Sequence, residues 1–133
     1  MPMKKNLSLL MILLFVTTLA SCSLTEKNLK ETGAKLLGQQ ALVEIFSQDR
    51  VVTRSTKSGS AKGYYSPDGT QKIKWQGGGD EGTYKIINGE FCSKWNATRS
   101  GKEECYRIYQ TEDNEYVWFK LDGSYDSKMV IIK

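Results

Sequence analysis

The hydrophobic residues of this chain follow three patterns along its length. A continuous apolar run covers residues 7–19, apolar residues at helical spacing follow at about 39–48, and short alternating runs fill residues 51–133. Spacing at i, i+3 and i+4 predicts an amphipathic helix, whereas alternation over four to eight residues predicts a half-buried strand. The patterns therefore predict a mainly β domain preceded by one short helix.

Short strands account for nearly everything after residue 50. The candidates number about eight and cover residues 51–56, 61–66, 70–76, 83–88, 90–96, 104–110, 115–121 and 128–133. Turn signals separate them, among them Asn88-Gly89, which favours a type I′ hairpin because both residues tolerate a positive φ. Strands with no helix between them predict an antiparallel meander that closes into a small barrel or sandwich, with the last strand paired to the first.

The predicted helix lies at about residues 39–48, immediately before the first strand. Leu42, Ile45 and Phe46 fall on one helical face, and Gly38 is a suitable N-cap. We expect this helix to pack over one end or side of the sheet.

The strand EYVWFKL at residues 115–121 has two different faces. One face carries Tyr116, Trp118 and Lys120, and the other carries Val117, Phe119 and Leu121. Because the second set is richer in aliphatic side chains, we expect it to face the core.

The N-terminal apolar run is typical of a signal peptide. It follows the basic stretch MPMKKN and spans 13 residues, whereas a membrane-spanning helix needs ~20. It ends at Leu19-Ala20-Ser21-Cys22, which resembles the bacterial lipobox, where a leucine and two small residues precede an invariant cysteine. The resemblance implies cleavage after residue 21 and lipid attachment to the thiol of Cys22. A simple secretory cleavage that leaves Cys22 as a free thiol is the alternative.

Lipid attachment predicts the location of the protein. A diacylglyceryl thioether together with an acyl chain such as palmitate on the freed α-amino group anchors a protein stably, whereas one chain binds marginally. By resemblance to lipoprotein sorting in Gram-negative bacteria, Ser23 implies the outer membrane, with the domain facing the periplasm or the surface. We therefore expect a signal peptide at 1–21, a lipidated tether at 22–36 with at most a helical turn, and a β domain at 37–133.

The charge balance and the absence of histidine limit the classes of function that the protein can have. Removal of residues 1–21 takes away two lysines and no acidic residue, so the 19 basic side chains fall to 17 against 15 acidic ones. This near balance gives no reason to expect nucleic-acid binding. With no histidine in the chain, Ser-His-Asp and Cys-His catalysis and the commonest zinc sites are excluded. We expect no enzyme activity, no catalytic residues, no cofactor and no metal.

The two remaining cysteines, Cys92 and Cys105, lie in neighbouring predicted strands. If the residue numbers of paired positions sum to 197, Cys92 falls opposite Cys105 and Phe91 falls opposite Tyr106. An exported protein meets an oxidising compartment, which favours a structural disulfide that closes a loop of about 14 residues. A redox-active or metal-binding pair is the alternative, although neither a C-x-x-C motif nor a histidine accompanies it.

Three further features carry candidate chemistry. The sequence WQGGGDEG at 75–82 is rich enough in glycine for a phosphate-binding loop but lacks the following Lys-Ser/Thr, so we interpret it as a mobile hairpin turn. The acidic pairs Asp80-Glu81, Glu103-Glu104 and Glu112-Asp113 lie at turns or strand ends, which favours solvated charge over a general acid and base. We expect most of the aromatic residues in the core or in cross-strand pairs and a few at a ligand groove or partner surface.

Several short motifs between residues 40 and 125 occur in a recognisable combination. They are the PDG turn at 67–69, the GTYKI strand after a glycine-rich loop, the C…W and CYRIY segments with their paired cysteines, and EIFS followed by VV. In this combination the chain resembles the bacterial family named domain of unknown function 995. The resemblance implies a small exported β-rich domain and no assigned activity.

These features together predict an outer-membrane lipoprotein with a small, non-catalytic β domain. We expect it to act as a binding or interaction module in the envelope, with the membrane as one partner and an envelope protein or a small ligand as the other. An inhibitor of a cell-wall or host hydrolase, similar to the anchored lysozyme inhibitors, is the alternative.

Overall fold

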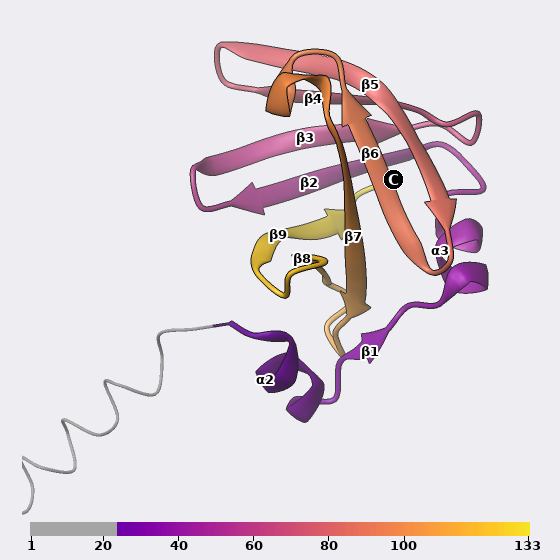
Figure 1. Ribbon diagram of the computed structural model, residues 1–133, viewed down its shortest axis with the longest axis vertical. Helices are drawn as coiled ribbons and strands as arrows, with labels where there is room; N and C mark the ends of the chain where they lie inside the picture. Colours follow the sequence, from indigo (N-terminus) through magenta and orange to yellow (C-terminus); the bar gives the residue numbers. More distant parts are fainter. Residues whose placement is uncertain (1–23) are drawn as a thin grey trace, which may run out of the picture.

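The strands predicted after residue 50 form one continuous meander in the computed structural model, which describes residues 24–133 (Figure 1). The predicted signal peptide, Cys22 and Ser23 lie outside the described residues. The elements are α2 (Glu26–Glu31), β1 (Lys35–Leu36), α3 (Gln39–Ile45), β2 (Arg50–Thr56), β3 (Gly59–Tyr65), β4 (Thr70–Trp75), β5 (Gly78–Ile87), β6 (Glu90–Trp95), the 3₁₀ helix η1 (Thr98–Gly101), β7 (Glu103–Gln110), β8 (Tyr116–Lys120) and β9 (Tyr125–Ile131). Within residues 24–133, no helix is both long and apolar enough to cross a membrane.

Strands β2 to β9 close into an eight-stranded barrel. Each pairs antiparallel with the next along the chain, and β9 returns to β2, where Ile131 lies opposite Val52. The short β1 adds a further strand beside the second half of β7, with Leu36 opposite Tyr109. The prediction of an antiparallel meander whose last strand pairs with its first is confirmed, and the closed form is a barrel.

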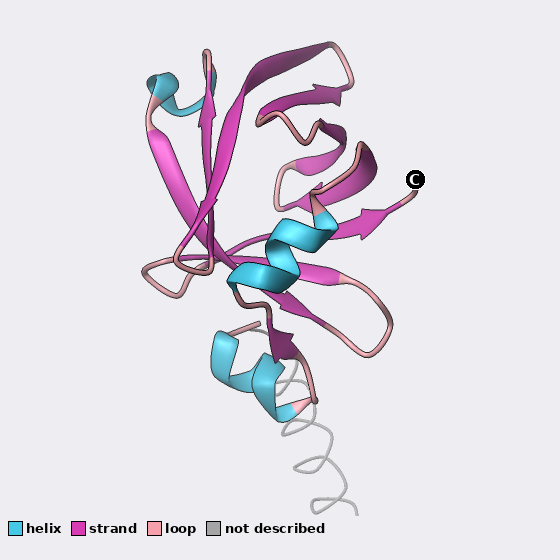
Figure 2. Ribbon diagram, turned by 90° about the vertical axis from the view of Figure 1, so that its right-hand side faces the viewer, coloured by secondary structure: helices cyan, strands magenta, loops and turns pink. Residues whose placement is uncertain are grey.

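Helix α3 closes one end of the barrel, as expected. The helix lies against the strands of the barrel (Figure 2). It begins after its N-cap Gly38 and, with Phe46 at its C-terminal end, buries Leu42 in the main apolar cluster of the barrel. The Gln39 side chain holds the helix against the β5–β6 turn, because it accepts from the Gly89 N–H and donates to the Ile86 carbonyl. That turn therefore lies at the closed end of the barrel.

Aromatic side chains fill much of the barrel interior. Its buried strand residues are Val52, Tyr65, Phe91, Tyr106, Ile108, Tyr116, Trp118 and Met129. The rings of Tyr84 and Phe91 stack with their centroids 4.8 Å apart, and Phe91 meets Trp118 edge-on at 4.8 Å. Burial of these rings supplies the largest favourable contribution to folding, because each removes ~150–250 Å² from water.

A second apolar cluster lies on the outside of the barrel, beneath α2. It joins Leu29 of α2 to side chains of β7 and β8, among them Val117 and Phe119. Trp118 points to the interior instead, and Leu121 is exposed. The prediction that the face with Val117, Phe119 and Leu121 is the barrel core is therefore wrong. The wide rings of the other face fill the barrel, and α2 buries the aliphatic face from outside.

Helix α2 and strand β1 come from the segment expected to be a tether. Thr25 caps α2 by accepting from the Asn28 N–H at 3.1 Å, and Leu29 is buried against the barrel. Strand β1 then pairs with β7. Most of the chain between residue 25 and α3 is thus folded onto the barrel (Figure 1).

The glycine-rich sequence forms strand rather than turn. Strand β5 begins at Gly78, and the turn from β4 is confined to two residues because Trp75 pairs with Gly78. The interpretation of all of 75–82 as a mobile turn is therefore wrong. Glycine is needed at position 82 because a Cβ there would lie 2.1 Å from the carbonyl oxygen of Lys94 on β6.

The Asn88-Gly89 turn between β5 and β6 has the predicted conformation. Asn88 has φ 52° and Gly89 has φ 75°. Positive φ at both central residues is what a type I′ hairpin requires, so this prediction is confirmed.

Candidate functional site

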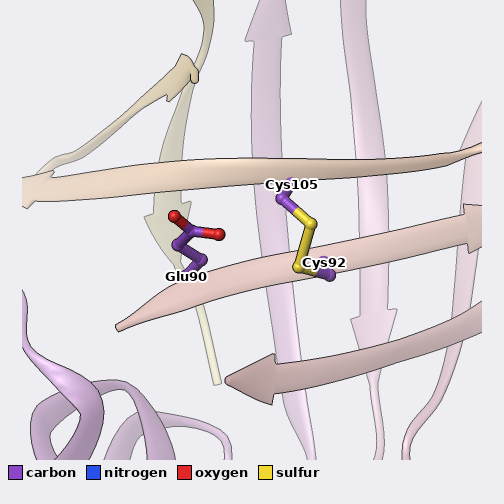
Figure 3. Close-up of side chains that lie close together, drawn as sticks. All are labelled: Glu90, Cys92 and Cys105. Atoms are coloured by element: carbon purple, nitrogen blue, oxygen red, sulfur yellow. A yellow bond between two sulfur atoms is a disulfide. The ribbon is translucent and has the colours of Figure 1, made fainter. Parts of the chain in front are cut away.

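The disulfide predicted from strand register is present. Phe91 lies opposite Tyr106 and Cys92 opposite Cys105, as expected, and the two cysteines are bonded to each other (Figure 3). The aromatic pair faces the interior, and the alternation of the strands therefore places the disulfide on the outer face of β6 and β7.

A carboxylate lies beside this disulfide. Glu90, Cys92 and Cys105 present an oxygen and two sulfur atoms within 4.8 Å of one another (Figure 3). Metal binding by cysteine requires the thiolate, and here both sulfurs are held in the disulfide bond. With the disulfide formed, the cluster is therefore a structural crosslink with a solvated glutamate next to it.

A cluster of lysines occupies the outer surface of β3 and β4, and we call it the lysine face. Lys62 lies directly opposite Lys74, and Tyr64 lies directly opposite Lys72. All three lysines are exposed, whereas Tyr64 is half-buried. The four outward side chains come from two adjacent strands of the barrel, so their relative positions are fixed by the ladder.

A shallow hollow of about 350 Å³ lies at this face. Its lining residues are Tyr64, Ser66, Thr70, Gln71, Lys72 and Lys74. The Lys74 ammonium sits 5.7 Å from the centre of the Tyr64 ring, which is cation–π range. The hollow therefore combines one aromatic surface with hydroxyl and ammonium groups.

The charges of the lysine face are only partly neutralised. Lys72 forms an ion pair with Glu81 at 3.6 Å, in which both side chains are more than half exposed. Neither Lys62 nor Lys74 makes an ion pair with any of residues 24–133. Three lysines against the single carboxylate of Glu81 leave the lysine face with a net positive charge.

A polar latch fixes α2 to the barrel. Arg107 donates to both carboxylate oxygens of Glu26, at 3.0 Å and 2.7 Å, and the Tyr109 hydroxyl donates to the same carboxylate at 2.5 Å. The hydrogen bond from Arg107 is the main cause that holds the pKa of Glu26 below its ordinary value. Burial, followed by the bond to Glu26, raises the pKa of Tyr109 to about 12.

The end of the barrel opposite α3 is crossed by η1. Asp80 accepts from the Ala97 and Thr98 backbone N–H groups at 3.2 Å and 2.8 Å, and the Thr98 bonds are the main cause that lowers the pKa of Asp80 to about 2. Arg99 reaches across to Asp126 on β9 at 3.0 Å. The loop is thus tied to the barrel on two sides.

Several of the acidic residues singled out in the sequence make contacts at the surface of the barrel, whereas Glu112 and Asp113 are exposed. Asp80 supports η1, Glu103 pairs with Lys85 at 3.4 Å, and Glu104 lies 3.9 Å from Lys120. Cys92 and Cys105 are brought together as predicted, whereas Cys22 lies outside the described residues.

Sequence reasoning missed the lysine face and the latch. The sequence signal for the lysine face is the alternation in KGY at 62–64 and in KIK at 72–74, which places Lys62, Lys72 and Lys74 on the same side of their strands as Tyr64. Only the strand register shows that Lys62 and Lys74 are directly opposed. The latch joins residues 81 and 83 positions apart, and no local pattern marks such a pair.

Comparisons with protein families, curated proteins and solved structures find no match for this chain. The resemblance to domain of unknown function 995 therefore stays a prediction, and the functional argument rests on the residues themselves.

Proposed function

We propose that this protein is an outer-membrane lipoprotein, anchored through Cys22, whose barrel is a non-catalytic module that binds an acidic saccharide at the lysine face. The observation that carries the proposal is the direct opposition of Lys62 and Lys74 on neighbouring strands. Like charges directly opposite each other destabilise a sheet. An anionic ligand that bridges the two ammonium groups turns this repulsion into attraction.

The lining of the hollow supports a saccharide as the ligand class. A sugar ring presents an apolar face to an aromatic side chain and hydroxyl groups to polar ones. Tyr64 supplies the aromatic surface, while Ser66 and Thr70 supply hydroxyl groups. The lysines add selectivity for carboxylate or phosphate groups on the sugar.

The latch supports a close attachment to the membrane. Only three residues separate Cys22 from Glu26, where α2 begins. An extended chain spans at most ~3.3–3.6 Å per residue, so a lipid on Cys22 holds the barrel directly at the bilayer surface. The lysine face, on strands distant from α2 in the sheet order, then remains available to envelope glycans.

Binding and anchoring are tested separately. Purified full-length lipoprotein is titrated calorimetrically with an oligogalacturonate and with a neutral oligosaccharide of the same length. We expect binding of the acidic chain only, weakened about tenfold or more, equivalent to ~1.4 kcal/mol, in Lys62→Gln/Lys74→Gln. The matched control Lys57→Gln/Lys102→Gln removes two exposed lysines elsewhere and keeps the affinity. Equal binding of both sugars contradicts the proposal.

The anchor is tested by the substitution Cys22→Ser. We expect the variant to lose lipid labelling and to leave the membrane fraction, because serine lacks the thiol on which the thioether forms. A variant that is still processed and still sediments with the outer membrane contradicts the anchor and leaves the binding result untouched.

Inhibition of a cell-wall hydrolase is the second candidate, and η1 is the feature that favours it. Ser100 stands in this exposed loop with φ 55°, beside Arg99 with φ 57°. Asp80 accepts a hydrogen bond from the Thr98 N–H and so fixes the loop. A rigid, exposed loop is what binding in an enzyme cleft requires. Inhibition of lysozyme by the wild type that is lost in Asp80→Ala supports this candidate; absence of inhibition by the wild type removes it.

A further inference from the structure

One charged side chain lies inside the barrel. Arg54 on β2 is only 7% exposed, and its strand neighbours are Ala61 on β3 and Met129 on β9. Its guanidinium lies 3.8 Å from the centre of the Trp118 ring. The barrel thus buries a positive charge against an aromatic face.

The hydrogen-bonding groups around this charge are unsatisfied. Among residues 24–133, five buried side-chain atoms lack a hydrogen-bond partner, and they are Arg54 Nε and Nη2, Tyr65 Oη, Trp118 Nε1 and Gln71 Oε1. Four of the five carry an N–H or O–H donor, and only Gln71 Oε1 is purely an acceptor. The unsatisfied interior groups are therefore four donors and one acceptor.

The cation–π contact with Trp118 leaves these donors unpaired. Stacking uses the flat face of the guanidinium, whereas its N–H bonds lie in the plane and point outward from the edge. A buried charge is costly unless it is both paired and hydrogen-bonded. As a purely structural residue, Arg54 would therefore stabilise the fold less than an apolar side chain of similar volume.

Neighbouring residues hold the donors in place. A Cβ at position 63 would lie 2.8 Å from Val52 Cγ2 and 3.2 Å from Tyr65 Cε2, so Gly63 makes the room that the Tyr65 ring fills. Phe91 contacts both the Tyr65 and the Trp118 rings. Burial raises the pKa of Tyr65 against the opposing charge of Arg54, and the negative charge of Asp126 adds to the rise, so the hydroxyl stays protonated and able to donate.

The end of the barrel opposite α3 lies beside η1. The β5–β6 turn lies against α3, and η1 joins the opposite ends of β6 and β7. There Arg99 lies 5.4 Å from the centre of the Tyr106 ring and pairs with Asp126. A register shift beside Trp118 leaves Asp126 as an extra residue in β9, and a bulge of this kind re-aims side chains.

We propose that the interior of the barrel binds a small oxyanion, a carboxylate or a phosphate, through Arg54, Tyr65 and Trp118. The guanidinium fork matches two oxygens of such an anion, and the hydroxyl and indole N–H supply further donors. The site is independent of the lysine face, because it lies on the inner surface of the same barrel.

The test uses the purified full-length protein, with sodium acetate, inorganic phosphate and sodium chloride added at matched ionic strength. The readouts are the Trp118 indole ¹H–¹⁵N resonance, assigned with Trp118→Phe, and the melting temperature. We expect acetate or phosphate, and not chloride, to shift the Trp118 resonance saturably and to raise the melting temperature. The anion that acts identifies the source as carboxylate or phosphate.

Matched variants separate binding from structure. Arg54→Met keeps the length of the side chain and removes the donors, and we expect it to abolish both responses. Arg54→Lys keeps the charge without the fork, so its response to oxyanions is expected to fall about tenfold in affinity. Lys62→Gln/Lys74→Gln is expected to respond like the wild type, which separates this site from the lysine face.

Three results overturn the proposal. The first is a wild-type protein whose Trp118 resonance is unmoved by either oxyanion, which leaves Arg54 a structural residue. The second is an equal effect of chloride, which indicates general screening. The third is an undiminished response in Arg54→Met. If Arg54→Met does not fold, the wild-type titration and Arg54→Lys still decide.

Discussion

The barrel interior and the cluster beneath α2 are both buried, yet they are built from different kinds of sequence. The interior collects side chains from strands that follow one another along the chain, with its rings on β3, β5, β6, β7 and β8. The outer cluster joins Leu29, from a polar segment, to Tyr109, Val117 and Phe119, about 80 residues or more away. The interior is a product of the meander, whereas the outer cluster depends on one short helix docking from a distance.

This difference separates global from local stability. Loss of an interior ring leaves a cavity that eight paired strands cannot collapse around, whereas the outer cluster loses contact with α2 without disturbing the ladder. We therefore expect substitutions in the interior to lower the free energy of unfolding of the whole barrel. Substitutions under α2 are expected to release that helix first.

The largest effect is predicted for Trp118→Ala, which removes a fully buried interior ring. We expect it to cost ~3–5 kcal/mol of unfolding free energy, measured by chemical denaturation. The matched substitution Phe119→Ala, next in sequence but outside the barrel, is expected to cost less because α2 can shift into the gap. A larger cost for Phe119→Ala contradicts the distinction.

Removal of the disulfide by Cys92→Ser/Cys105→Ser is expected to act on the barrel and not on α2. The two cysteines are separated by 13 positions, and loop-closure entropy for a loop of this size corresponds to ~3 kcal/mol. Denaturation with and without a reductant measures this cost in the wild type. The variant is the control, and its unfolding free energy is expected to be the same with and without the reductant. Selective exchange of α2 amides in the variant would argue against this assignment.

A smaller, local effect is predicted for Leu29→Ala. Leu29 is 6% exposed, and a buried Leu→Ala change costs ~2–5 kcal/mol, with the low end expected for a helix at the surface. Proteolysis is expected to cut near α2 while the barrel stays intact. Leu24→Ala, at a position 41% exposed, is the control and is expected to change stability by less than ~0.5 kcal/mol.

The smallest effect is the pH dependence of the latch. The folded-state pKa of Glu26 lies below its model-peptide value of 4.5, so its stabilising contribution is complete above pH 4.5 and is lost as pH falls through the folded-state pKa. The pKa of Tyr109 is raised from 10.0 to about 12, so its contribution is complete below pH 10 and is lost on the way to pH 12. Glu26→Gln is expected to reduce the loss of unfolding free energy in acid, while Asp80, whose pKa is lowered to about 2, keeps its own part of it. An unchanged loss in that variant would assign it to other carboxylates.

The meander, the short helix, the type I′ turn and the disulfide register were all predictable, because each depends on residues close in sequence or on simple alternation. Which face of β8 points into the barrel was not predictable, because both faces of this strand are buried and the alternation then carries no polar signal. Strand β5 was misjudged at Gly82, where glycine serves a close approach of two backbones rather than a turn. The burial of Arg54 could not be predicted from the sequence, because the residues beside it in the strand are ordinary polar residues.

Hydrogen exchange at the backbone amides of α2 tests most directly whether this helix is folded onto the barrel, so that α2 and the barrel form one body. In the full-length protein the Leu29 amide, which bonds to the Thr25 carbonyl at 3.0 Å, is predicted to be protected at neutral pH and to lose protection in Glu26→Gln/Leu29→Ala. Exchange of this amide at the rate of an unfolded chain in the wild type would contradict a docked helix and restore a free tether.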